Sequence, residues 1–403
     1  MNSTLIKNII SNWGVVIFNV TFPLMTLPLL THSLGVDGYG QYAKVLSFAM
    51  LYVVLGELGM DMALTRRIGN DASSHLHKGL LHVFIKLRLV QSLFFLLPLA
   101  LIGLVIFEFS IVEAIFFITV GFFTSLNFGF YFHGVLQASR LFYLSLICKL
   151  IVLISYFVAW YFNFEIVGFF IIGGISALLL SVLPGFYVWY RLRNVTAKYV
   201  DVKSILTDSM QFYGSRLVVN AYLSGSTFLF SFFVSDTNVG FYSLALQIYR
   251  IGASLIGGLA KTLLVSISFS SVYSNLLKIV VLLSIFALVL APVVWFVGEW
   301  AIPLVFGEGF NGVILYVMLF YIGLVFQISG AVFGYPYFNA VGRIELAHKS
   351  IFFSSLVYVA LISLILLSGN DNLFLFIIPI VVVDILVSLS RMILSVKVSR
   401  EQV

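Results

Sequence analysis

Long apolar stretches, interrupted by polar or turn-forming residues, run through this sequence from end to end. A helix that crosses a bilayer needs about 20 mainly apolar residues. Stretches of that kind cover residues 9–30, 38–64, 79–107, 111–138, 142–162, 166–190, 208–234, 239–269, 276–297, 313–338, 351–367 and 373–396. Glycine, asparagine or aspartate mark many of the links between them, as at residues 236–238. The pattern predicts an all-α integral membrane protein with twelve transmembrane helices.

The charged residues test this segmentation independently. If the N-terminus lies inside, the outer links and the adjoining helix ends hold acidic residues and none of the 22 Lys and Arg. Those acids are Asp37, Glu108, Glu113, Glu165, Asp236, Glu299, Glu308 and Asp371. The inner links and tails hold Lys7, Arg66, Arg67, Lys78, Arg140, Arg191, Arg193, Lys198, Lys203, Arg343, Lys349, Lys397 and Arg400. Because cytoplasmic loops carry an excess of Lys and Arg, both termini are predicted to be cytoplasmic.

The two halves of the sequence resemble each other. The second predicted helix begins Gly40-Gln41-Tyr42, and the eighth begins Gly240-Phe241-Tyr242. Further pairs are Gly14 with Gly214, Leu46 with Leu246, Leu55 with Leu255, and the link Ser139-Arg140 with Gly342-Arg343. Six helices per half give both halves the same orientation, so an axis along the membrane normal should relate them. We expect an N-terminal six-helix lobe (1–195), a cytoplasmic inter-lobe linker (196–206) and a C-terminal six-helix lobe (207–403).

Composition agrees with a membrane protein. Hydrophobic residues make up 61% of the chain and charged residues 9%, with a mean hydropathy of +1.12. Soluble domains carry about 25% charged residues. The formal net charge of +6 follows from the basic inner links, so nucleic acid is not an expected partner.

Enzymatic and metal-binding signatures are missing from the sequence. The single cysteine, Cys148, excludes a disulfide framework, and the spacing His75-x-His77 falls in a polar link without further ligands. No phosphate-binding glycine loop is present, and no outer link is long enough for a catalytic domain. We therefore expect a non-enzymatic protein without metal or cofactor.

Five charged residues lie deep inside predicted spans. They are Arg250, Arg216, Lys44, Lys149 and Asp384. A charge at this depth is costly unless it meets a partner or a wet cavity. Structural pairing is one interpretation, with Asp384 neutralising a cation. The other interpretation is a hydrated cavity that receives an anionic group such as phosphate. The surplus of cations favours this cavity.

Charges nearer the inner face are open to simpler explanations. Glu57, Asp61 and Lys261 are candidates for a cytoplasmic gate or ordinary interface residues. Arg88 and Arg391 lie within about two turns of the inner face, where long side chains snorkel towards water. Asp384 is the candidate coupling residue, because a carboxylate that alternates between two surroundings can load and release a proton; a fixed ion pair is the alternative.

Several short motifs carry a resemblance to a known family. They are Leu34-Gly35-Val36-Asp37-Gly38-Tyr39-Gly40-Gln41-Tyr42, Leu58-Gly59-Met60, Arg66-Arg67-Ile68, Gly240-Phe241-Tyr242-Ser243-Leu244-Ala245 and Phe306-Gly307-Glu308-Gly309-Phe310. With them the chain resembles the polysaccharide flippases of O-antigen type. These belong to the multidrug/oligosaccharidyl-lipid/polysaccharide exporter superfamily, together with multidrug and toxin extrusion transporters and the lipid II flippase. Twelve helices match the O-antigen type, whereas the lipid II flippase usually has fourteen.

The resemblance implies alternating access by two six-helix lobes around a cationic cavity. Its expected substrate is an undecaprenyl-pyrophosphate-linked oligosaccharide for lipopolysaccharide, moved from the cytoplasmic to the periplasmic leaflet of the bacterial inner membrane. Coupling to an ion gradient, and partners among membrane lipids and other polysaccharide assembly proteins, are implied as well. The sugar and the coupling ion stay open. The alternatives are a drug/cation antiporter of the same fold and an integral-membrane polysaccharide polymerase.

Overall fold

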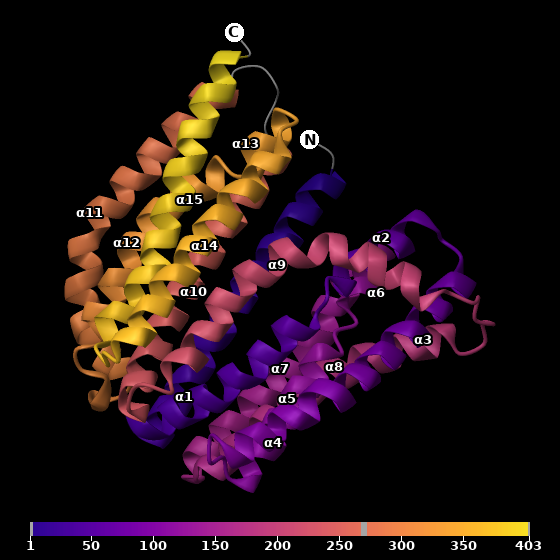
Figure 1. Cartoon of the computed structure of the whole chain (residues 1–403), viewed down its shortest axis with the longest axis horizontal. Helices are drawn as coiled ribbons and strands as arrows, with labels where there is room; N and C mark the ends of the chain where they lie inside the picture. Colours follow the sequence, from indigo (N-terminus) through magenta and orange to yellow (C-terminus); the bar gives the residue numbers. More distant parts are fainter. Residues whose placement is uncertain (1–2, 267–271, 402–403) are drawn as a thin grey trace. The chain divides into compact units, whose positions relative to one another are not determined.

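The computed structural model describes residues 3–266 and 272–401, and helices account for 87% of the chain (Figure 1). Strands are absent from these described residues, which confirms the predicted all-α class. The α-helices are α1 (Ser3–Gly56), α2 (Met60–Asn70), α3 (Ser74–Gln91), α4 (Leu97–Val105), α5 (Ile111–Ser125), α6 (Gly129–Gly134), α7 (Ala138–Tyr161), α8 (Ile166–Leu192), α9 (Val202–Phe230), α10 (Asp236–Ser266), α11 (Val272–Phe306), α12 (Val313–Val332), α13 (Tyr335–Ala340), α14 (Ile344–Ser368) and α15 (Leu373–Glu401). A π-helical turn, η1 (Ser92–Leu96), joins α3 to α4, and a 3-10 turn, η2 (Glu308–Phe310), precedes α12.

Nine helices within the described ranges are long and apolar enough to cross a membrane. A tenth span results if Thr21–Gly56 and Met60–Asn70, which are bent by 49°, cross together. The chain is thus a multi-pass membrane protein. Two predicted spans, 9–30 and 38–64, share α1, whose backbone leaves the helical conformation at Gly35 (φ 65°, ψ −172°). The total of twelve stays a prediction.

The chain divides into two compact units. Unit 1 comprises Met1–Gly40 and Leu229–Val403, and unit 2 comprises Gln41–Phe228. Unit 2 is therefore one continuous stretch of chain inserted into unit 1. These boundaries differ from those of the predicted lobes, which stay a prediction.

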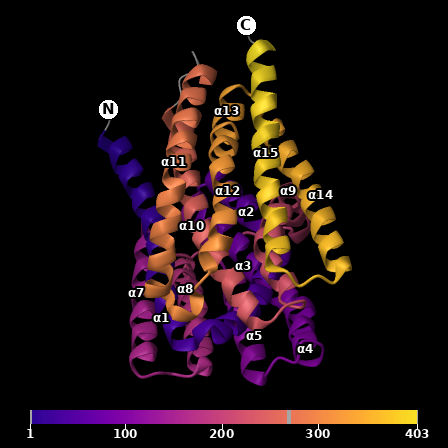
Figure 2. The ribbon, with the colours of Figure 1, turned by 90° about the vertical axis from the view of Figure 1, so that its left-hand side faces the viewer.

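Unit 1 is a helical bundle built around α12, which packs against α10, α11 and α15, while α14 packs on α15 (Figure 2). Aromatic residues that follow α12, among them Phe333 and Phe338, form its buried core together with Leu276 and Val398.

In unit 2, α8 packs against α5 and α7, and α2 packs against α6. Its buried core is also rich in aromatic residues, including Phe84, Phe128, Phe130 and Phe132. Phe84 contacts Phe130 with ring centroids 4.8 Å apart. These aromatic side chains fix how α3, α6 and α8 pack, and the polar residues described below depend on that packing.

A helix break in unit 2 recurs in unit 1 with the same hydrogen bonds. After α6, Gln137 N donates to Phe132 O (2.7 Å), and Leu136 adopts a left-handed φ of 57°. After α13, Arg343 N donates to Phe338 O (2.8 Å), and Gly342 adopts a φ of 71°. Both are helix C-terminal motifs with a left-handed residue after the last turn. The counterpart of Gly342-Arg343 is thus Leu136-Gln137, three residues before the predicted pair Ser139-Arg140, because the repeated feature is the helix end and not the basic residue.

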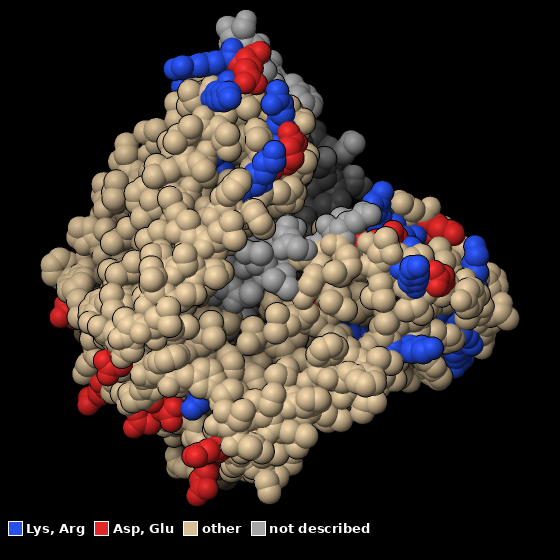
Figure 3. Space-filling view, viewed as in Figure 1, with Lys and Arg blue, Asp and Glu red and all other residues tan. Residues whose placement is uncertain are grey.

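Charges concentrate at the ends of each unit. On the face shown in Figure 3, the visible Lys and Arg of each unit gather mainly at one end, whereas Asp and Glu dominate the opposite end of unit 1. This segregation is what the positive-inside rule describes. The cytoplasmic location of the termini stays a prediction.

Candidate functional site

Asp384 occupies a buried polar site in the middle of α15. Its side chain is only 6% exposed, and its Oδ2 accepts a hydrogen bond of 2.7 Å from the Tyr249 hydroxyl on α10. Gln327 Nε2 on α12 lies 3.5 Å from the same hydroxyl oxygen. A Cβ atom on Gly323 would lie 2.7 Å from Asp384 Oδ2. Glycine at 323 therefore lets α12 approach the carboxylate.

Arg250 follows Tyr249 directly on α10 and is half-buried. The hydroxyl groups of Tyr39, Tyr242 and Tyr249 lie within electrostatic range of its guanidinium. The tyrosine hydroxyls give Arg250 polar surroundings.

The other predicted cavity residues are distributed over both units. Lys44 on α1 and Lys149 on α7 are half-buried in unit 2, whereas Arg250 and Asp384 belong to unit 1. Arg216 on α9 and Lys261 on α10 have side chains outside the described residues. Tyr249 hydrogen-bonds Asp384 and directly precedes Arg250 on α10. A single cavity shared by all four cations stays a prediction.

Glu57 and Asp61 lie where α1 ends and α2 begins, next to a buried arginine. Arg88 on α3 donates through Nη1 to Gly56 O (2.6 Å) and to Gln91 Oε1 (2.9 Å). Both carboxylates lie within electrostatic range of its guanidinium. The snorkelling predicted for Arg88 is wrong, because its side chain is 3% exposed and binds a carbonyl oxygen at the end of α1.

The snorkelling predicted for Arg391 on α15, in unit 1, is also wrong. Its guanidinium donates to Gly330 O (2.5 Å), Ala347 O (3.3 Å) and Ser350 Oγ (3.0 Å). Gly330 lies in the last turn of α12, where carbonyl groups lose their intrahelical donors. Arg391 therefore donates hydrogen bonds to carbonyl oxygens near a helix break instead of reaching the membrane surface.

The predicted linker 196–206 is bound to unit 2. Lys198 N donates to His75 O (2.9 Å), Lys78 Nζ donates to Val195 O (2.5 Å), and the His75 ring nitrogen Nδ1 lies 2.9 Å from Thr196 Oγ1. Farther along, Arg67 and Asp208 form an ion pair with a distance of 2.6 Å between Nη2 and Oδ2. Local packing thus holds this segment on α2 and α3, while its role as a hinge stays a prediction.

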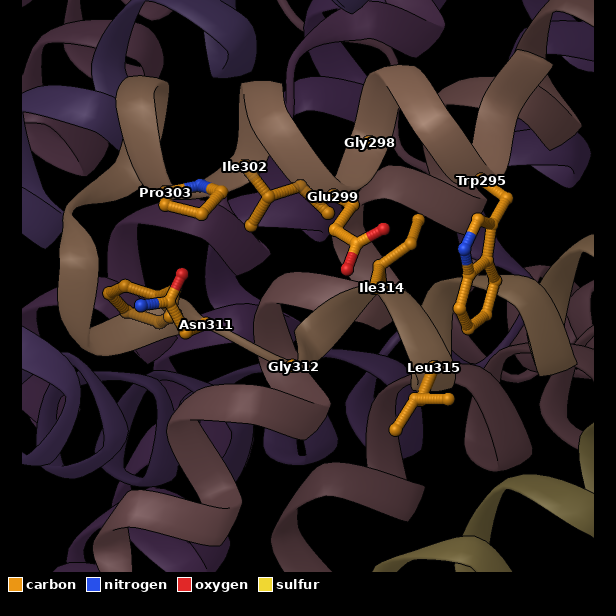
Figure 4. A pocket seen from close by; sticks show the side chains of 10 residues that line it. Trp295, Gly298, Glu299, Ile302, Pro303, Asn311, Gly312, Ile314 and Leu315 are labelled. Atoms are coloured by element: carbon orange, nitrogen blue, oxygen red, sulfur yellow. The ribbon is translucent and has the colours of Figure 1, made fainter. Parts of the chain in front are cut away.

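A groove of about 320 Å³ lies at the end of α11 that leads to η2 (Figure 4). Trp295 and Glu299 from α11 and Asn311 from the following turn supply its polar groups. It shares no residue with the Arg250 and Asp384 site.

Tyr249 and Gln327 are the polar site residues that the sequence interpretation missed. Both lie inside predicted spans, at residues 239–269 and 313–338. Their depth inside the spans, together with their neutral hydrogen-bonding groups, is the signal in the sequence that identifies both.

The comparisons with known proteins point to one family and one fold. A family model described as "Polysaccharide biosynthesis protein" matches residues 5–265. A search of curated proteins gave no match. A multidrug resistance MATE family transporter of the MOP superfamily, solved in an inward-facing conformation, is similar with a TM-score of 0.70 at 12% identity, over 97% of this chain and 98% of that one.

Two further solved structures are similar. A MATE protein in the bent conformation has a TM-score of 0.56 at 13% identity, over 97% of this chain and 96% of that one. A MOP superfamily transporter from Pyrococcus furiosus has a TM-score of 0.53 at 12% identity, over 96% and 95%. At these low identities the likeness shows the fold alone.

Proposed function

Because the chain belongs to the family of polysaccharide biosynthesis proteins and has the fold of MATE transporters, we propose that it is a flippase for lipid-linked oligosaccharides. Its substrate would be an undecaprenyl-pyrophosphate-linked repeat unit of O-antigen type. The protein would move this substrate from the cytoplasmic to the periplasmic leaflet of the bacterial inner membrane by alternating access, coupled to an ion gradient.

The surroundings of Arg250 are the observation that carries this proposal. A guanidinium deep in a membrane protein normally marks a partner or a substrate path. Around Arg250 the groups in electrostatic range include three tyrosine hydroxyls, and the buried Asp384 accepts its hydrogen bond from Tyr249. An arginine presents several donors in a planar fork that matches phosphate oxygens. Arg250 is therefore suited to bind the pyrophosphate.

The remaining candidates have supporting roles in this scheme. Arg216, Lys44 and Lys149 would extend the cationic path along the pyrophosphate or acidic sugars. Glu57, Asp61 and Lys261 would form the cytoplasmic gate, and Asp384 would couple transport to the ion gradient. Alternating access would move the lobes 1–195 and 207–403, joined by the linker 196–206. The recurring helix end after α6 and α13 supports this division into related halves.

The decisive experiment measures transport of a pyrophosphate-linked oligosaccharide in proteoliposomes. We expect Arg250→Ala to reduce transport at least about tenfold, because losing one charge-assisted bond costs about 1.5–3 kcal/mol. Arg250→Lys should keep part of the activity. Arg343→Ala removes an exposed arginine paired with Glu401 (3.3 Å) and is the matched control.

Two outcomes would reject the assignment of Arg250. Full transport by Arg250→Ala would remove the residue from the substrate site. Normal transport with reduced protein stability would show that the arginine serves the fold.

A drug/cation antiporter of the same fold is the second candidate, and the buried carboxylate of Asp384 is the observation that favours it. A cationic drug would need an acid in its site, and Asp384 is a buried acid. Efflux of a cationic dye from cells that carry the protein separates the two functions. If Asp384 binds the drug, Asp384→Asn should abolish efflux while Arg250→Ala leaves it unchanged.

A further inference from the structure

The described span that is most exposed to lipid is α11. Only 6% of its apolar 18-residue stretch is buried inside the protein, against 17–44% for the other eight described spans. Phe296 and Trp300 lie on the half of α11 that leads to η2, and each is 70% exposed. Because an exposed apolar surface of this kind marks contact with a membrane, lipid molecules touch this half of α11 directly.

The groove between α11 and α12 interrupts this lipid-facing surface (Figure 4). The two helices approach closely here, because a Cβ atom on Gly298 would lie 2.5 Å from Ile314 Cδ1. Trp295 and Asn311 border the groove, and the carboxylate of Glu299 lies between them. The indole nitrogen of Trp295 is on the side of the ring that faces the groove. One acid and two N–H donors thus meet in the groove.

Among the described residues, no Lys or Arg lies within ion-pair distance of Glu299. The turn 307–312 and α12 contain no Lys or Arg, and the one on α11 is Lys278. At 1.5 Å per residue, Lys278 lies about 30 Å from Glu299 along the helix axis. A charge next to hydrocarbon is costly unless it is paired or hydrated. Glu299 is therefore suited to a cation that the lipid supplies.

Glu299 also lies at the depth of the phospholipid headgroups. Since α11 ends at Phe306, Glu299 is about 10 Å from the helix end along the axis. Tryptophan is enriched at the boundary between headgroups and hydrocarbon, and Trp295 and Trp300 flank Glu299 in the sequence. The groove therefore lies at this boundary, in the leaflet predicted to be the outer one.

We propose that this groove binds the headgroup of phosphatidylethanolamine from the surrounding bilayer. The primary ammonium of this lipid pairs with Glu299, because it offers N–H donors to the carboxylate. The phosphate accepts hydrogen bonds from the Trp295 indole and the Asn311 amide. The acyl chains follow the exposed face of α11 past Phe296. The inference concerns a lipid that is not transported, and it does not depend on the proposed function.

Other ligands match the groove less well. Phosphatidylcholine carries a quaternary ammonium without N–H donors, and phosphatidylglycerol carries no ammonium. A metal ion would neutralise Glu299 but leave the N–H groups of Trp295 and Asn311 without an acceptor. Among these ligands, a primary ammonium beside a phosphate meets the acid and the two donors together.

Native mass spectrometry of the detergent-purified full chain tests the site. The protein would be titrated with phosphatidylethanolamine, and with phosphatidylcholine that has the same acyl chains. We expect phosphatidylethanolamine to bind at least about fivefold more tightly, and Glu299→Gln to remove this preference, because hydrogen bonds between charged groups are the strong ones. Trp295→Phe removes the donor to the phosphate, so it should weaken both lipids by about twofold to fivefold and keep the preference.

The matched control is Glu308→Gln, because Glu308 is an exposed acid of η2 that does not line the groove. This variant should keep the preference of the parent protein for phosphatidylethanolamine. No preference in the parent protein, or an undiminished preference in Glu299→Gln, would overturn the site.

The melting temperature in lipid nanodiscs provides a second readout. A lipid that binds the folded protein alone stabilises it by mass action. Replacing phosphatidylcholine with phosphatidylethanolamine should therefore raise the melting temperature of the parent protein and of Glu308→Gln, but not that of Glu299→Gln. An equal rise with Mg²⁺ in detergent without phosphatidylethanolamine, lost in Glu299→Gln, would make Glu299 a simple cation site and would also overturn the proposal.

Discussion

Arg391 and Arg250 both lie within unit 1, but their surroundings differ. Arg391 donates to two carbonyl oxygens and a serine hydroxyl near the break between α12 and α13. Arg250 lies within the continuous helix α10, near three tyrosines. A broken helix requires donors for its free carbonyl groups, whereas a continuous helix has none to satisfy at that position. The helix break therefore accounts for Arg391, whereas Arg250 lies in an unbroken helix.

Arg88 in unit 2 lies at a helix break, as Arg391 does in unit 1. It binds Gly56 O where α1 ends, as Arg391 binds Gly330 O in the last turn of α12. An arginine thus donates a hydrogen bond to a carbonyl oxygen at a helix break in both units. A buried cation in this fold indicates a substrate site only after the helix ends near it have been examined.

Arg391→Ala should give the largest effect on stability. It leaves Gly330 O and Ser350 Oγ without the Arg391 donor, and each such loss costs about 1–3 kcal/mol. Ala347 O also loses its bond to Arg391 but still accepts from the Ser350 hydroxyl at 2.8 Å. We expect the free energy of unfolding to fall by about 3 kcal/mol or more, measured by thermal denaturation in detergent. Arg343→Ala should cost less than about 1 kcal/mol, because its ion pair is exposed. An unchanged melting temperature for Arg391→Ala would remove the distinction between the two kinds of arginine.

Gly323→Ala should have a smaller effect and act on the Asp384 site. The added methyl group would lie 2.7 Å from Asp384 Oδ2, so α12 and α15 must separate or the carboxylate must turn away from Tyr249. Such overpacking typically costs about 1–3 kcal/mol. The matched control is Gly257→Ala on α10, where no described atom outside the local helix backbone lies within 4 Å of the new methyl group.

Gly257→Ala should be neutral or stabilising by up to about 1 kcal/mol, because alanine favours the helix interior. If the two alanine variants melt at the same temperature, the close approach of Gly323 to Asp384 does not contribute to the fold. Thermal denaturation of both proteins in the same detergent provides the comparison.

The sequence allowed the membrane class, the helical fold and the depth of Arg250 and Asp384 to be predicted, because each depends on hydropathy and spacing. It did not allow the roles of Arg88 and Arg391 to be predicted, because these depend on helix breaks that hydropathy does not show. The predicted spans 38–64 and 313–338 continue through the breaks at residues 57–59 and 333–334. The depth of Tyr249 within its span can be read from the sequence, but its hydrogen bond to Asp384 cannot, because that bond depends on α10 and α15 being neighbours in space.

Asp384→Asn should have the smallest effect on stability, and it tests what the Asp384 site does. An asparagine oxygen can still accept the hydrogen bond from Tyr249, and the side-chain volume hardly changes. We therefore expect a change of less than about 1 kcal/mol, in line with the net value of one hydrogen bond.

Transport should respond differently to Asp384→Asn. An asparagine cannot bind and release a proton, so a coupling role for Asp384 predicts that transport in proteoliposomes no longer depends on an imposed proton gradient. Tyr249→Phe keeps the carboxylate and removes its donor, so it should weaken this dependence without abolishing it. If Asp384 is instead a fixed partner in the fold, Asp384→Asn should lower the melting temperature and preserve the gradient dependence. A stable Asp384→Asn protein that still responds to the gradient would exclude Asp384 as the coupling residue.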